Sequence, residues 1–275
     1  DVTEDRMVSM MVGREIQNYY IKHNRKKGSK TVLEVCSLTR KGSFKDVSFH
    51  LMEGEILGVS GLVGAGRTEV MRAVFGADPI DGGECRLYGK VYKAKTPKDT
   101  IKMGMGLIPE DRRGQGLLLG KNVKENASLA SVYANSHKGF MDFEWEKREA
   151  LNYIKRLRIK TSSEKTVTRN LSGGNQQKVV IAKWLMAKSR ILIMDEPTRG
   201  IDVNAKAEIY TLMKEFVENG GSIILVSSEL PEILGCSNRI MVMREGRVTG
   251  FLDESEATEE TVMQLASKGT SGEGE

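Results

Sequence analysis

The sequence predicts an α/β fold, in which parallel strands alternate with helices and ligand-binding loops follow the carboxyl ends of the strands. Three apolar runs, at 56–60, 191–194 and 223–226, have the length and composition of buried strands. The first run leads into a glycine-rich loop, and the second ends in a pair of carboxylates. A segment with helical spacing follows each run, so we expect these loops to lie at one edge of the sheet.

The composition fits one large domain, or one domain with a subdomain. The chain has 275 residues, of which 39% are hydrophobic and 29% charged, enough for a sizeable core. A net charge of +5 without an aromatic-interleaved basic patch argues against nucleic-acid binding. Cys36, Cys85 and Cys236 form no CxxC pair, which argues against a zinc site or disulfide framework and indicates a reducing compartment. No apolar run reaches the ~18 residues of a membrane span, and no signal peptide is visible. We therefore expect a soluble protein whose membrane link runs through a partner.

The first thirty residues differ from the rest of the chain. Residues 1–13 predict a short capped helix, and residues 14–30 are polar and basic, with a flexible Gly-Ser step at 28–29. This stretch is interpreted either as a disordered leader or as the tail of an upstream domain followed by a linker. Because the sequence begins with Asp1 rather than Met, we expect it to be part of a longer chain.

Strands are expected at 31–35 and 44–51, and a third at 56–60 runs into the loop 61–68 and a helix ending at Phe75. Strand, glycine loop and helix is the context of a phosphate-binding P-loop. The spacing fits G-x-x-x-x-G-K-[ST] except that Arg67 replaces the lysine. Backbone N–H groups can still wrap a phosphate, but a forked guanidinium does not simply replace a compact ammonium. We expect nucleotide binding without fast hydrolysis at this loop.

The middle of the chain predicts shorter elements. We expect a hairpin turn at 81–84, a short helix at 96–103 and a strand ending at Ile108. The PEDRR run at 109–113 then has two interpretations, a functional turn or a surface charge cluster. Amphipathic helices are predicted at 122–134 and 143–157. The second carries an apolar stripe, interpreted as core packing, formed by Trp145, Leu151, Ile154 and Leu157.

Ser172 follows these helices and is a good N-cap for a helical run that begins with two glycines. The glycines allow close approach of a ligand, and a helix N-terminus suits a phosphate, although an ordinary capped helix remains the alternative. The next strand ends in Asp195 and Glu196. The rest of the chain predicts two helices separated by a strand, then a hairpin and a last helix. These elements are a helix at 203–217 with Asp202 as N-cap, a strand at 222–228, a short helix at 229–234, a hairpin at 240–251 and a helix at 259–266.

Together the helix at Ser172 and the strand ending at Asp195 resemble the signature motif and Walker B strand of ABC-type ATPases, over about residues 31–251. The runs GLVGAGRTE, IPEDRR, LSGGNQQK and MDEPTRGIDV further resemble the second ATP-binding domain of bacterial double-domain monosaccharide importers. This resemblance implies an ABC-type P-loop NTPase core with an antiparallel β subdomain and an inserted helical subdomain at 113–170. It also implies that 1–13 is the tail of a preceding ATP-binding domain, 14–30 a linker, 31–251 the ABC domain, and 252–275 a C-terminal helix and tail.

The resemblance assigns roles to individual residues. Those expected to bind ATP are Arg40, in place of an adenine-stacking aromatic, and the loop residues Gly61, Gly64, Ala65, Gly66, Arg67, Thr68 and Glu69. Thr68 and Asp195 are expected to contact Mg²⁺, and Glu196 to orient the attacking water. Glu110 and Ser228 stand where the family has a catalytic glutamine and histidine. The signature residues Leu171, Ser172, Gly173, Gly174 and Gln176 are expected to act on a nucleotide held by another domain, with Gly200 and Asp202 in the interface loop.

The departures from the family at Arg67, Glu110 and Ser228 surround one γ-phosphate, so we expect this P-loop's own site to be impaired. The expected function is ATP-driven monosaccharide import at the cytoplasmic face of the inner membrane. The expected partners are the upstream ATP-binding domain, permease subunits and, indirectly, a sugar-binding protein, with no nucleic acid. One alternative is a regulatory module that holds ATP without turnover. Another is a soluble ABC protein of translation or DNA repair, which the absence of coiled-coil arms and of a strong basic face disfavours.

Overall fold

The computed structural model describes residues 20, 28–92, 96–137 and 140–267, and it confirms the α/β fold. The helix predicted at 1–13 and most of the linker predicted at 14–30 lie outside the described residues. The strands are β1 (Thr31–Arg40), β2 (Phe44–Met52), β3 (Ile56–Gly61), β4 (Gly82–Leu87), β5 (Lys90–Tyr92), β6 (Met105–Ile108), β7 (Ser136–His137), β8 (Phe140–Met141), β9 (Ile191–Asp195), β10 (Ser222–Val226), β11 (Arg239–Arg244) and β12 (Arg247–Asp253). The helices are α2 (Arg67–Phe75), α3 (Pro97–Lys102), α4 (Val123–Ser128), α5 (Phe143–Arg156), α6 (Gly173–Met186), α7 (Val203–Glu218), α8 (Leu230–Cys236) and α9 (Glu259–Ser267).

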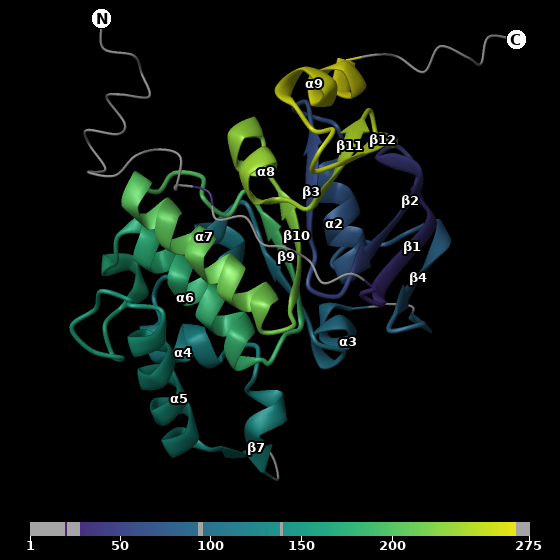
Figure 1. Cartoon of the computed structure of the whole chain (residues 1–275). Helices are drawn as coiled ribbons and strands as arrows, with labels where there is room; N and C mark the ends of the chain where they lie inside the picture. The colour runs from purple at the N-terminus through teal and green to yellow at the C-terminus, as the bar shows by residue number, and fades with distance from the viewer. Residues whose placement is uncertain (1–19, 21–27, 93–95, 138–139, 268–275) are drawn as a thin grey trace, which may run out of the picture.

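A six-stranded sheet of order β12-β11-β3-β10-β9-β6 crosses the middle of the molecule (Figure 1). Its strands pair in parallel except for β12, which pairs antiparallel with β11. Helix α2 packs against β3 and β6, while α6 and α7 lie on the other side of the sheet (Figure 1). Every residue of β9 and β10 is buried, as expected for parallel strands covered on both faces. The loops after β3, β9 and β10 therefore meet at one sheet edge.

A second sheet, of order β2-β1-β4-β5, is antiparallel and lies beside the first (Figure 1). The hairpin turn predicted at 81–84 is wrong, because Gly82–Glu84 belong to β4 and the chain reverses at Tyr88-Gly89. Gly83 has a φ of +89°, and a Cβ there would lie 2.5 Å from the Ser37 carbonyl oxygen. The glycine thus serves a register shift between β1 and β4 rather than a turn.

The helical subdomain contains the short β7–β8 pair, which was not predicted, and its helices differ from the prediction at α4 and α5. Helix α4 ends at Ser128, although the prediction extended it to residue 134. Just after this end, the Ser131 hydroxyl donates to the Ser128 carbonyl at 2.8 Å. In α5, Leu151 is 44% exposed and does not belong to the packed stripe. Glu146 is buried instead, and its carboxylate accepts a hydrogen bond from the Ser128 hydroxyl at 2.7 Å and forms an ion pair with Lys124 at 2.5 Å. Apolar periodicity does not register such polar contacts.

Within the described residues, no helix combines the length and apolar character needed to cross a bilayer.

Candidate functional site

The glycine-rich loop at 61–68 joins the end of β3 to the start of α2. Gly66 is the N-cap of α2 with a φ of +87°, a left-handed conformation that favours glycine. No side chain caps this helix end, so its N-terminal N–H groups face the loop, as in phosphate-binding sites. The Gly246 N–H donates to the Ala65 carbonyl at 3.0 Å, which fixes the loop against the β11–β12 hairpin.

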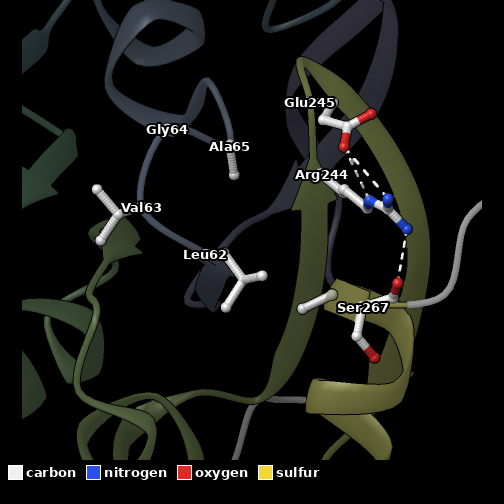
Figure 2. A pocket seen from close by; sticks show the side chains of 8 residues that line it. Leu62, Val63, Gly64, Ala65, Arg244, Glu245 and Ser267 are labelled. Carbon is white, nitrogen blue, oxygen red and sulfur yellow. Dashed lines mark hydrogen bonds and ion pairs between the residues drawn. The ribbon is translucent and has the colours of Figure 1, made fainter.

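One hollow borders this loop, and a second is lined by the β1–β2 turn nearby. One, of about 270 Å³, lies between loop residues 62–65 and the end of α9, where Arg244 donates to the Ser267 carbonyl at 2.6 Å (Figure 2). The other, of about 450 Å³, is lined by residues 39–45 and Glu245. Arg40 borders this second hollow, and its guanidinium donates to Asp78 at 3.0 Å. The guanidinium of Arg40, which we expect to stack on adenine, is therefore already hydrogen-bonded to a carboxylate.

Asp195 ends β9 beside the glycine-rich loop, and only 2% of it is exposed. The Thr68 hydroxyl donates to its Oδ2 at 2.7 Å, whereas no described group hydrogen-bonds its buried Oδ1. Burial raises the pKa of this carboxyl, and the Thr68 hydrogen bond opposes that shift. A Thr hydroxyl and one carboxylate with a spare oxygen fit Mg²⁺, which takes most other ligands from water and phosphate. The residues predicted to contact the metal are thus adjacent.

Glu196 follows directly and adopts a φ of +47°, a strained conformation for a residue with a side chain. Arg67 Nη2 lies 3.8 Å from Glu196 Oε1, and Arg67 Nη1 donates to the Ser227 carbonyl at 2.6 Å. Burial raises the pKa of Glu196, while a hydrogen bond from Ser228 and the charge of Arg67 lower it. The structure therefore brings together Arg67, Glu196 and Ser228. The guanidinium lies between the loop and the glutamate.

Glu110 is placed differently, in an ion pair with Arg199 of the loop that precedes α7. The Arg199 side chain is 65% exposed to solvent and that of Glu110 is 40% exposed. Its expected role at the nucleotide of this domain stays a prediction, because the contact that the structure provides is with the interface loop.

The signature segment begins α6, with Ser172 as an exposed N-cap. Leu171 packs partly against the core, and Gly174 lets α6 approach α7, since a Cβ there would lie 2.5 Å from Ala205 Cβ. Gln176 is 1% exposed and donates to the Thr168 carbonyl at 3.2 Å. Gln176 therefore holds α6 to the preceding turn, and its expected action on a second nucleotide stays a prediction.

The interface loop lies against this helix start. Asp202 caps α7 by accepting a hydrogen bond from the Ala205 N–H at 2.9 Å, and Gly200 has a φ of +67°. The guanidinium of Arg112 donates to the carbonyls of Arg199 and Gly200 at 2.8 and 3.3 Å. The sequence prediction did not assign a role to Arg112. The sequence feature that could have indicated this role is an arginine in a tight charged turn directly after a buried strand.

Comparisons with known proteins agree with this geometry. The family model described as ABC transporter matches residues 44–199, more than half of the chain. The chain is 53% identical over 265 residues to "Ribose import ATP-binding protein RbsA" of Bacillus subtilis (strain 168), covering 96% of this chain and 54% of that protein. It is 48% identical over 269 residues to "Putative ribose/galactose/methyl galactoside import ATP-binding protein 2" of Burkholderia cenocepacia (strain HI2424), covering 98% and 52%. The chain thus spans about half the length of the curated relatives it matches.

The fold likewise matches solved ATP-binding cassettes. The ADP conformation of MJ1267, an ATP-binding cassette of an ABC transporter, aligns with a TM-score of 0.72 at 18% identity, covering 87% of this chain and 96% of that one. The ADP- and phosphate-bound dimer of MJ0796 aligns with a TM-score of 0.70 at 21% identity, covering 81% and 98%. With the matched family model and the arrangement of loop, carboxylates and signature helix, this chain belongs to the ABC transporter family of ATP-binding proteins.

Proposed function

We propose that this chain is the second ATP-binding domain of a double-domain sugar importer, which couples ATP binding and hydrolysis to monosaccharide uptake. In this proposal its own P-loop site is impaired, and its signature helix completes the site of the upstream domain. The observation that carries the proposal is the contrast between the two surfaces. Arg67 lies beside Glu196 at the P-loop, whereas Ser172 is exposed at the start of α6. Sugar import is chosen because the relatives described above are named as sugar import ATP-binding proteins.

The chemistry of the P-loop follows from its charges. Thr68 and Asp195 would hold Mg²⁺, which when bound neutralises phosphate charge. Glu196 is the candidate to orient the attacking water, but Arg67 partly neutralises it and is tethered to the Ser227 carbonyl. A γ-phosphate at this loop would compete with the glutamate for the same guanidinium. Arg67 also favours a second interpretation, a site that holds ATP for regulation without turnover. Loss of hydrolysis by the full-length complex when the signature helix is substituted distinguishes the two, because only the first requires this domain to complete a working site.

A groove of about 760 Å³ is our candidate contact for the permease. It lies between α3, the residues after α4 and the end of α6. Ile101, Leu129 and Met186 supply apolar lining, and lysines at 98, 102 and 188 border it. Such a surface fits an amphipathic helix with acidic residues. We therefore place a cytoplasmic helix of an integral-membrane subunit here, with the sugar-binding protein contacted only through that subunit.

The test is affinity purification of the full-length parent protein from detergent-solubilised cells. We expect integral-membrane permease subunits to co-purify in stoichiometric amount and the complex to hydrolyse ATP. Recovery with ribosomes or DNA, and without permease, would support the soluble ABC protein and contradict the importer.

Arg67→Ala should leave ATP hydrolysis by the full-length complex within about 2-fold of the unchanged protein, a loss of well under 1 kcal/mol of transition-state stabilisation. The reason is that turnover takes place at the other P-loop. Steady-state kcat and KM for ATP measure this. A loss as large as that caused by a signature substitution would contradict the asymmetric-site proposal.

A further inference from the structure

The charged turn after β6 is attached to α6 and to the interface loop. The Asp111 carboxylate accepts hydrogen bonds from the N–H groups of Arg113 and Gly114, at 3.1 and 3.0 Å, and starts a π-helical turn over Arg112–Gly116. At the far end of this turn, the buried Lys183 of α6 donates to the Gly116 carbonyl at 2.8 Å. The turn is therefore fixed to the last turn of α6 independently of the contacts that Arg112 makes.

Arg112 extends from the start of this turn to the N-terminus of the same helix. Its guanidinium donates to the carbonyls of Arg199 and Gly200. A Cβ on Gly173 would lie 2.7 Å from Arg112 Nη2 and 3.2 Å from the Gly200 carbonyl oxygen. Glycine at 173 therefore creates the space in which the guanidinium and the interface loop meet the helix. Three segments distant in sequence converge on one side chain.

Glu110 makes a second attachment to the same loop through its ion pair with Arg199. Exposed ion pairs contribute little to stability, so we expect this pair to orient the interface loop rather than to stabilise the fold. A fork that donates to two consecutive carbonyls restricts the loop far more than a single flexible contact does. Arg112 is thus the principal attachment and Glu110 the supporting one.

We propose that residues 110–112 form a latch that holds the interface loop 199–202 against the signature helix, with Arg112 as a positioning residue. The latch rests on the proposed function, in which both elements face the nucleotide of the upstream domain. It makes them one rigid surface, so Ser172 and the interface loop reach that nucleotide in fixed relative position. Glu110 then serves the neighbouring site through Arg199.

The first test is hydrogen exchange in the full-length complex. Arg112→Ala should speed amide exchange across 199–202 by about 10-fold, because the loop loses the two hydrogen bonds that its carbonyls accept from Arg112 and opens more readily. Exchange within the last turn of α6 should stay unchanged, since Lys183 still fixes the charged turn there. Arg113→Ala is the matched control, because it removes the same charge from the next, exposed residue. Unchanged exchange at 199–202 would overturn the latch, whatever the hydrolysis assay gives.

The second test is kinetic. Arg112→Ala should lower kcat by about 10- to 100-fold, the scale of a small misplacement of catalytic elements, with KM for ATP unchanged because another P-loop binds the substrate. Arg112→Lys should recover part of the rate, and reversing both charges together (Glu110→Arg with Arg199→Glu) should restore what either change alone removes. Additive losses in that pair, or a kcat equal to that of Arg113→Ala, would overturn the latch. If Ser172→Arg leaves hydrolysis intact, the proposed function fails, and the exchange data alone decide the latch.

Discussion

Ser172→Arg should reduce ATP hydrolysis by the full-length complex about 100-fold or more. In the proposed arrangement this exposed N-cap faces the γ-phosphate bound by the other domain, where a long side chain would separate the two surfaces. Losing preorganised donors to a reacting group costs about 100- to 1,000-fold in kcat. The domain itself should stay folded, since the hydroxyl accepts only from the Asn175 amide and caps no backbone N–H. Steady-state hydrolysis and thermal unfolding measure the two effects.

Ser162→Arg is the matched control for this substitution. Ser162 is also exposed, in the turn ten residues earlier, and its hydroxyl bonds Thr166. We expect normal hydrolysis from this variant, because the added charge and bulk are the same but the position lies outside the signature helix. Equal losses at 162 and 172 would mean that arginine acts through general destabilisation. Retained hydrolysis in Ser172→Arg would remove the main support for a completed partner site.

Much of the fold and part of the site could be predicted because they depend on local patterns. The runs that became β3, β9 and β10 are apolar throughout, as strands buried on both faces must be. Parallel strands place their carboxyl ends at one edge, which explains why the loops after β3, β9 and β10 bring Arg67, Glu196 and Ser228 together. Glu110, which the sequence analysis grouped with Arg67 and Ser228, instead pairs with Arg199.

The errors arise where tertiary contacts decide. Gly83 carries a turn-like sequence but serves a register shift against β1. Leu151 has the right residue type for a core, yet the packed face of α5 is set by the hydrogen-bonded carboxylate of Glu146. Arg112 donates to the carbonyls of Arg199 and Gly200, which are 87 and 88 positions later in the sequence, and no spacing rule predicts such a contact. That Gln176 is buried within this domain is likewise not evident from its place in the motif.

Arg239→Ala should lower the free energy of unfolding of this domain by about 3–5 kcal/mol, the usual cost of breaking a buried ion pair from one side. Glu55 is fully buried, and Arg239 Nε donates to its Oε1 at 3.0 Å. The same guanidinium donates to the His50 carbonyl at 2.7 Å, so it also ties β2 to β11. Denaturant unfolding at pH 7 measures the loss.

Arg86→Ala provides the comparison, because its ion pair with Glu84 is exposed on both sides and should contribute little to stability. Replacing both buried partners together, as Glu55→Leu with Arg239→Leu, should recover much of the stability, since an apolar pair carries no buried charge. Glu55 directly precedes β3, whereas the P-loop follows that strand, so the pair supports the strand from the end opposite the site. A loss from Arg239→Ala no greater than that from Arg86→Ala would show that solvent reaches Glu55, and the strand that presents the P-loop would then be held by apolar packing alone.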